Sequence, residues 1–406
     1  MEDVKATNKQ KRFIRSIAMS AHFWGLVCGW MVFSIACADV RAVDMDHGQL
    51  ADAAAMRGIA FLSQRQSEFG SWSPQIGPAV TAMVLTVMLD RPDLVQDDLV
   101  VDRALAFILS KCRDNGGIHD GILQNYNTAI CLSALARARQ SPRVVEAIDK
   151  GCEFLRQLQW YDQVDPKSVS VGPEHPFYGG AGYGKHGRPD LSNTQIMLQG
   201  LYDAGLSPTD PVFQRALVFI SRCQGTAANM QCGDQIVQDG GFVYSTSIDK
   251  NHIGISQSLA SPELRDEAIM GKPVTGLRTY GSMTYAGFKS YVYAMLSRDD
   301  PRVIDAYNWI RRHYTVDHNP GMPEGLKLDG YFYYLMTMSR ALDVWGSRYI
   351  ETPDGYRHDW SKDMTTKLLA MQRADGSWWN KSGRWMEDDT NLVTAYALIA
   401  LVHALK

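Results

Sequence analysis

The chain has 406 residues, of which 45% are hydrophobic and 21% are charged. This composition is typical of a globular protein with a sizeable core, and it excludes a disordered or fibrous chain. The net charge is −3 and no basic cluster occurs after residue 15, which argues against a nucleic-acid partner.

Residues 1–42 have the pattern of a targeting segment. An apolar, uncharged run at 23–38 follows five basic residues, Lys5, Lys9, Lys11, Arg12 and Arg15. Ala36 and Ala38 form a signal-peptidase pattern, and Val40 with Ala42 forms a second one. We therefore expect a signal peptide at 1–42 and an exported mature protein, periplasmic or extracellular. The alternative is an uncleaved anchor at 23–38, although that run is short for a membrane span. We expect membrane association only through this segment, and only if it is not cleaved.

A short motif recurs along the rest of the chain. It combines a basic residue, a small residue, an aromatic-aliphatic pair and a final glutamine, and it occurs at 57–66, 150–159 and 215–224. A fourth copy at 103–112 ends in Cys112, a degenerate one lies at 305–314, and the copy at 363–378 shares Gln-x3-Gly-Ser-Trp with residues 66–72. The apolar spacing of these copies predicts amphipathic helices.

A second, more apolar helix is expected after each copy. These segments lie at 77–89, 125–138, 190–205, 279–296, 329–342 and 390–405. They are apolar nearly all round, so they must be covered on every side. Six such hairpins predict an all-α fold, a closed α/α toroid (α6/α6 barrel) with the apolar helices inside. We expect one domain at 43–406, with an inserted loop at about 225–278 because that connection is longer than a hairpin needs.

The repeated strings resemble the QW motif of squalene-hopene and oxidosqualene cyclases, and more loosely the repeats of protein prenyltransferase β subunits. The resemblance covers nearly the whole mature chain. It implies that the motif residues tie each outer helix to its turn, since a buried amide must be satisfied and a Trp covers a large area. They are Gln66, Trp72, Gln159, Gln224, Gln372 and Trp378.

In these cyclases a D-x-D-D-T string at the start of an inner helix protonates the substrate. The corresponding string here is DLSNT at 190–194, which keeps Asp190 but has Ser192 and Asn193 in place of the other two carboxylates. Such an acid must be held neutral by its surroundings. Asp190 is therefore a candidate catalytic residue. Asp388 and Asp389, in an EDDT string at 387–390, are further candidates, although a helix N-terminus favours Asp for capping alone.

The resemblance to prenyltransferases implies a zinc site that this chain lacks. Asn127 and Ser192 stand where the family has His and Cys ligands, so Asp190 alone of the three is retained. A catalytic zinc needs three protein ligands. The five cysteines after residue 42 have no CxxC or zinc-ribbon spacing either. We expect no metal and no cofactor.

Aromatic residues are concentrated on the fourth and fifth inner helices and on nearby loops. As ligand-binding candidates we select Tyr183, Tyr244, Tyr285, Tyr291, Tyr331 and Tyr333. Several tyrosine hydroxyls need partners, which fits a partly wet cavity, while packing between helices is the simpler alternative for any one residue.

Three functions remain open on the sequence. The first is binding of an apolar, isoprenoid-type small molecule without standard cyclase chemistry. The second is a terpene cyclase/mutase-like activity with a modified acid site. The third is a carbohydrate-active toroid enzyme, which would need two carboxylates across a groove.

Overall fold

The computed structural model describes residues 47–406, apart from 186, 228, 230–235, 248–252 and 262–275. The predicted signal segment at 1–42 lies outside these residues. Contacts divide the chain into two units, Met1–Gln49 and Leu50–Lys406, and the fold below is that of the second unit. In the described part of the chain, no helix has the length and apolarity that a membrane span requires.

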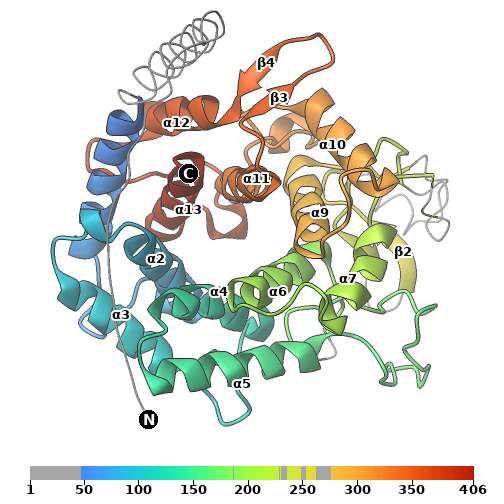
Figure 1. Cartoon of the computed structure of the whole chain (residues 1–406), viewed down its shortest axis with the longest axis horizontal. Coiled ribbons are helices and arrows are strands. Elements are labelled where there is room, and N and C mark those ends of the chain that lie inside the picture. The colour runs from blue at the N-terminus through green and yellow to red at the C-terminus, as the bar shows by residue number, and fades with distance from the viewer. Residues whose placement is uncertain (1–46, 186, 228, 230–235, 248–252, 262–275) are drawn as a thin grey trace, which may run out of the picture. The chain divides into compact units, whose positions relative to one another are not determined.

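Six apolar helices form an inner ring (Figure 1). They are α2 (Ala79–Asp90), α4 (Gln124–Leu135), α6 (Leu191–Asp203), α9 (Gly281–Tyr293), α11 (Tyr331–Trp345) and α13 (Thr390–Ala404). Each packs on the next, and α13 packs on α2, which closes the ring. The predicted closed α/α toroid is therefore confirmed.

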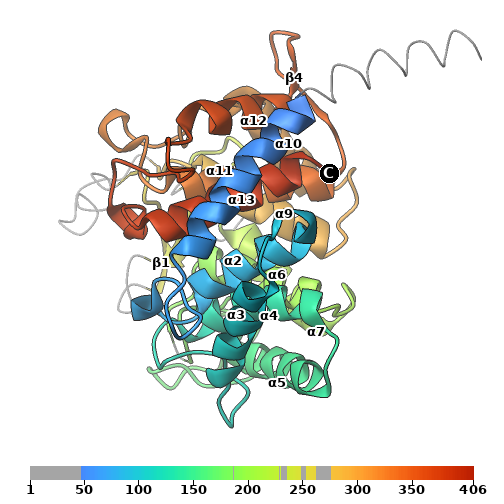
Figure 2. The same ribbon diagram turned by 90° about the vertical axis from the view of Figure 1, so that its left-hand side faces the viewer.

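An outer layer of amphipathic helices surrounds this ring. It consists of a helix at 50–64, α3 (Asp98–Ser110), α5 (Pro142–Leu158), α7 (Pro211–Arg222), α10 (Pro301–His313) and α12 (Trp360–Met371). The side view places the helix at 50–64 between α12 and α3 (Figure 2). Ser141, Asp210 and Asp300 cap α5, α7 and α10, each followed by a proline at the first helical position. This pairing satisfies orphan amides and presets the backbone angle.

The motif glutamines link each outer helix to the next. The side-chain amide of Gln159 donates to the carbonyls of Gly179 and Val212, both at 2.9 Å. The amides of Gln66, Gln224 and Gln372 each bond a glycine carbonyl of the following turn and a carbonyl of the next outer helix in the same way. A short polar motif therefore fixes the spacing of the outer layer.

Threonines near the start of the inner helices fasten the turns. The hydroxyls of Thr81 and Thr394 accept from the amides of Trp72 and Trp378 at 3.0 and 3.1 Å. The hydroxyls of Thr128, Thr194 and Thr284 accept from turn amides at the equivalent places. The indole of Trp378 also donates to the Leu368 carbonyl at 2.8 Å, as its repeat counterpart does to Leu62.

The last repeat contacts the first. Arg57 donates through Nε to Gln372 Oε1 at 3.1 Å, and Gln372 donates to the Ala54 carbonyl at 2.8 Å. Asn391 bonds Ser73 Oγ at 3.1 Å. The closing pair thus uses the same bonds as pairs within the array, so no end of the ring needs a polar cap.

Strands occupy two connections. β1 (Ser245–Ser247) and β2 (Ile253–Gln257) pair antiparallel within the predicted insertion, parts of which lie outside the described residues. β3 (Tyr349–Glu351) and β4 (Arg357–Asp359) form a hairpin between α11 and α12. The 3₁₀ turns are η1 (Pro74–Ile76), η2 (Pro92–Leu94), η3 (Ala136–Ala138), η5 (Glu324–Leu326) and η6 (Arg384–Met386).

Candidate functional site

A cavity of about 320 Å³ lies at the N-terminal ends of the inner helices. The starts of all six contribute to its wall, and the volume is at the lower end of the range for small-molecule sites. The insertion supplies Tyr244 and Leu259. The full wall is Ile76, Ala79, Val80, Met83, Leu123, Tyr126, Tyr183, Ser192, Tyr244, Leu259, Tyr280, Ser282, Met283, Gly330, Tyr333, Trp385, Met386, Glu387, Leu392 and Tyr396.

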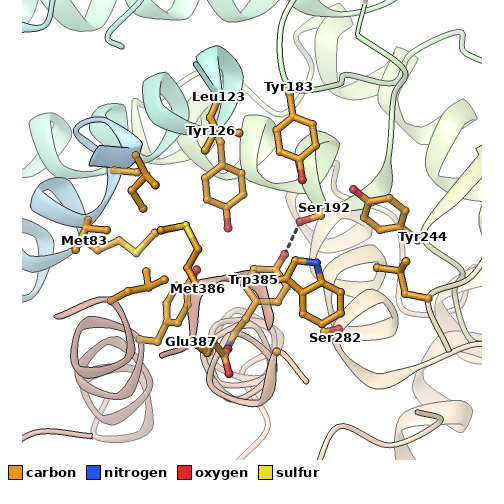
Figure 3. Close-up of a pocket in the computed structure, with 18 of the residues that line it drawn as sticks. Met83, Leu123, Tyr126, Tyr183, Ser192, Tyr244, Ser282, Trp385, Met386 and Glu387 are labelled. Carbon is orange, nitrogen blue, oxygen red and sulfur yellow. Dashed lines mark hydrogen bonds between the residues drawn. The ribbon is translucent and has the colours of Figure 1, made fainter. Parts of the chain in front are cut away.

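Aromatic rings dominate this wall (Figure 3). Six tyrosines and one tryptophan line it, among them the predicted Tyr183, Tyr244 and Tyr333. The Tyr333 hydroxyl is bonded to Ser192 Oγ at 3.0 Å and accepts from Gln195 Nε2 at 3.0 Å. Burial raises the pKa of Tyr333 to about 12, so its hydroxyl is neutral at physiological pH. The tyrosines therefore offer π faces and neutral hydroxyls, not charge.

Ser192 faces the cavity at the place where the cyclase resemblance puts the central carboxylate. Its hydroxyl is hydrogen-bonded to the Tyr333 hydroxyl at 3.0 Å. An alcohol does not protonate an alkene, because the charge left on oxygen is far less stable than a carboxylate. At this position the wall therefore has a hydroxyl group and no carboxylic acid.

Asp190 stands just behind the wall as the N-cap of α6. It is 1% exposed, and it accepts from the backbone and side-chain nitrogens of Asn193 at 2.7 and 2.8 Å. Burial raises the pKa of Asp190 to about 6, while hydrogen bonds from Asn193 and from the Tyr244 hydroxyl act in the opposite direction. Since Asp190 does not line the cavity, its route to a ligand would be through Tyr244.

Glu387 is the one carboxyl that lines the cavity among the described residues, and the sequence analysis did not select it. It is 1% exposed. Its two oxygens accept from the amides of Tyr333 at 2.8 Å and Phe332 at 3.2 Å, and from the side chain of Asn380. Burial raises the pKa of Glu387 to about 7, against these three donors.

The local reason for this placement is the start of α11. Gly330 is its N-cap residue and has no side chain to cap the helix. Glu387 supplies the missing acceptor from another loop, and the positive end of the helix favours a carboxylate there. Gly330 also leaves room for the Trp385 ring, since a Cβ at Gly330 would lie 3.0 Å from it.

Trp385 and Met386 precede Glu387 in an unusual backbone conformation. Their φ angles are 54° and 66°, in the left-handed region that bulky side chains rarely adopt. Both line the cavity, and the Arg384 guanidinium lies 4.7 Å from the centre of the Trp385 ring. Each such residue costs about 1–3 kcal/mol, and such strain clusters at functional sites. The segment Trp385–Met386–Glu387 therefore forms part of the cavity wall in a conformation that the surrounding structure has to stabilise.

The two other catalytic candidates lie outside the cavity wall. Asp389 is the N-cap of α13 and accepts from the amides of Asn391 and Leu392 at 2.8 and 3.1 Å. Asp388 is exposed. The capping alternative accounts for Asp389, and the EDDT string reaches the cavity through its first residue.

Three of the selected tyrosines pack between helices. Tyr291 donates to Gln224 Oε1 at 2.8 Å, which braces a motif glutamine. Tyr331 donates to the Val316 carbonyl, and the Tyr285 ring packs edge-on against Tyr334 at 5.8 Å. None of the three lines the cavity, so we do not include them in the ligand site.

Tyr126, Tyr280, Tyr396 and Trp385 are wall residues that the sequence analysis did not select. Three of them lie in or next to the first turns of inner helices, and this position is the signal that could have found them. In the part of the chain that the structure describes, no group of His, Cys, Asp or Glu could hold a metal ion.

No protein-family model matches the chain, and no curated protein matches its sequence. Solved structures do match its fold. A variant of the type II terpene cyclase MstE from Scytonema, without ligand, shares 13% identity with a TM-score of 0.51, over 89% of this chain and 99% of that one.

Two glycoside hydrolases are similar in the same way. An inactive α-1,6-mannanase variant of Salegentibacter, bound to α-1,6-mannotriose, shares 12% identity with a TM-score of 0.50, over 89% of this chain and all of that one. A family 76 glycoside hydrolase from a bovine Bacteroides thetaiotaomicron strain shares 10% identity with a TM-score of 0.50, over 86% of this chain and 77% of that one. At these identities the likeness concerns the fold alone.

Proposed function

We propose that this chain binds an apolar, isoprenoid-type small molecule in the cavity at the N-terminal ends of its inner helices. The observation that carries the proposal is the wall itself. It is built from aromatic rings, methionines and aliphatic side chains, with the hydroxyls of six tyrosines and two serines and one carboxyl. Such a surface binds by apolar burial and ring contacts, at about 25 cal/mol per Å² of apolar area removed from water.

Standard cyclase chemistry finds no support at the expected position. Ser192 occupies the wall there, and Asp190 is held behind it with its oxygens on Asn193. Protonation of an alkene requires a neutral carboxylic acid that points at the substrate. Binding without cyclisation therefore fits this wall better than catalysis by the family's route.

A second candidate function is cyclisation with Glu387 as a replacement acid. The observation in its favour is a pKa raised by burial to about 7, so that a large fraction of this carboxyl carries a proton at neutral pH. Against it, both oxygens already accept hydrogen bonds from neutral donors, which hold the ionised form. We rank this activity second.

The carbohydrate-active alternative ranks below both. A glycosidase needs two carboxyl groups on either side of its bond. Glu387 is the single carboxyl among the described wall residues, and the wall is apolar rather than an open acidic groove.

We also propose that the protein acts outside the cytoplasm, on the basis of the signal-like segment at 1–42. An apolar ligand would then come from the cell envelope or the medium.

The test is retention of geranylgeraniol by the purified chain after gel filtration, quantified by mass spectrometry. We expect stoichiometric retention, about tenfold weaker in Trp385→Ala because a ring of the wall is lost. Trp379→Ala is the matched control: Trp379 is 48% exposed against 42% for Trp385, lies in the same connection and does not line the cavity.

Three outcomes separate the candidates. Recovery of chemically unchanged geranylgeraniol from the purified chain supports the binding function. A cyclised isomer of the same mass, absent with Glu387→Gln, would replace the binding proposal by the cyclase. No retained ligand and no product would overturn both.

A further inference from the structure

The described wall of the cavity carries an acidic group and no basic group. Among the described residues that line it there is no Lys, Arg or His, and Glu387 is the single ionisable carboxyl. The other polar side-chain groups are tyrosine and serine hydroxyls and the Trp385 indole N–H, and three methionines add polarisable sulfur. The faces of seven aromatic rings carry negative potential. The described part of the wall therefore favours positive charge over negative charge.

This asymmetry limits what the cavity accepts. A phosphate or carboxylate head group would leave water without meeting a cation, which is strongly unfavourable. A prenyl diphosphate or a fatty acid is thus a poor ligand. A cation on an apolar skeleton fits much better, because aromatic faces bind alkylammonium groups with about 2 kcal/mol or more when water is excluded.

Among the residues that the structure describes, no Lys, Arg or His forms an ion pair with Glu387. Its hydrogen-bond donors are backbone amides at the start of α11 and the Asn380 side-chain amide, all of them uncharged. Arg384, on the same loop, pairs with Asp329 at 3.5 Å, and its guanidinium lies 4.7 Å from the centre of the Trp385 ring. A buried carboxylate satisfied only by neutral donors can be stabilised further by a ligand cation.

We propose that the ligand of this cavity carries a single positive charge on an apolar skeleton, an alkylammonium, and that Glu387 is its counter-ion. This inference rests on the proposed binding function and names the chemical class of its ligand. Capping of α11 is compatible with it, since the helix end fixes the carboxylate while the cavity brings the cation.

A pH dependence follows from the groups around Glu387. From α11 it faces Tyr331 and Tyr333, from α13 Tyr396, and from its own connection Asn380. Burial raises the pKa values of these tyrosines above the ordinary range, so they remain neutral below pH 9. Glu387, with a pKa of about 7, is then the group that ionises, and a permanent cation binds more tightly as pH rises from 6 to 8.

The experiment compares three ligands with the same ten-carbon chain, below their micelle concentrations: decyltrimethylammonium, 1-decanol and decanoate. Isothermal titration calorimetry of the full chain measures each affinity at pH 6 and pH 8. We expect decyltrimethylammonium to bind at least tenfold more tightly than 1-decanol at pH 8, with a smaller preference at pH 6. Decanoate is expected to bind most weakly.

Two variants assign the effect. Glu387→Gln should remove the preference for the ammonium and keep the affinity for 1-decanol. Asp388→Asn, which removes the adjacent exposed carboxyl outside the wall, should keep the preference.

If Glu387→Gln fails to fold, the pH dependence in the unmodified chain decides: its absence overturns the role of Glu387. Equal binding of 1-decanol and the ammonium would overturn this inference and leave the binding function intact. No binding of any of the three would overturn both.

Discussion

The two ends of the inner ring differ in how they are filled and in how their charged side chains are paired. At the N-terminal ends lies an apolar cavity with carboxyls in or behind its wall, Glu387 and Asp190, whose pKa values burial raises. At the C-terminal ends, basic side chains are mostly paired. Arg137 Nε lies 2.6 Å from Asp90, and His403 Nδ1 lies 2.6 Å from Asp343.

Helix dipoles explain which sign lies where. The amides at the start of a helix favour anions and the carbonyls at its end favour cations. Basic side chains at the C-terminal ends pair with acids there, Asp90 and Asp343 among them, while the buried carboxyls Asp190 and Glu387 at the N-terminal ends accept from helix amides. Lys289, 1% exposed near the end of α9, is an exception: its Nζ donates to Gln199 Oε1 at 2.8 Å, and burial lowers its pKa well below the ordinary value, which disfavours the charged form.

What differs is how the charges are satisfied. The C-terminal end is filled by side chains, and the space next to it, lined by Gln199 and Arg340 among others, is about 20 Å³, enough for a single water. The N-terminal end leaves a cavity of about 320 Å³, and no cation among the described wall residues pairs with its carboxyl, Glu387. Side chains fill the C-terminal end of the ring, and the N-terminal end has space for a ligand. The following predictions test this division.

The largest expected effect concerns the pH dependence of Glu387. Its pKa rises from an ordinary 4.5 to about 7 on folding, so the folded state holds the proton more tightly between these values. The stability that this group contributes is complete below pH 4.5 and declines as pH rises to 7, by about 3 kcal/mol at most.

Urea unfolding of the native chain and Glu387→Gln between pH 4.5 and 8 measures this. Loss of the cap lowers the free energy of unfolding of the variant by the same amount at every pH. The readout is therefore the slope of the free energy of unfolding against pH. A difference between the two proteins that does not change with pH would contradict the raised pKa.

The next effect belongs to the C-terminal end. Arg137→Met leaves Asp90 and Asp203 without their shared cation, and we expect a loss of about 2 kcal/mol, since these side chains are only partly buried. Retention of geranylgeraniol should not change. A variant that unfolds normally but no longer binds ligand would contradict the separation of the two ends.

The smallest effect concerns a hydroxyl of the cavity wall. Tyr333→Phe removes the partner of Ser192 and of Gln195, whose side chain is fully buried. We expect a loss of about 1 kcal/mol in the free energy of unfolding, with apolar ligand affinity kept or raised. Tyr126→Phe, another wall tyrosine, serves as the comparison. A loss above about 3 kcal/mol would mean that this hydroxyl holds the wall together.

The repeats by themselves determined the architecture. Glutamine, glycine and threonine at fixed spacing specify bonds that lie within one hairpin or between adjacent ones, so they can be read from the sequence. The capping role of Asp190 and Asp389 follows from the same local logic, because an N-cap depends on the next three residues.

Only the tertiary structure decided which side chains meet a ligand. The inner helices are apolar on every side, so their periodicity does not tell the face toward the axis from the face toward a neighbour. Tyr333 therefore lines the cavity, whereas Tyr331, two residues earlier, packs between helices and donates to the Val316 carbonyl. Glu387 could not be selected, since its burial depends on α11, which precedes it by more than 40 residues, and on the missing side chain at Gly330.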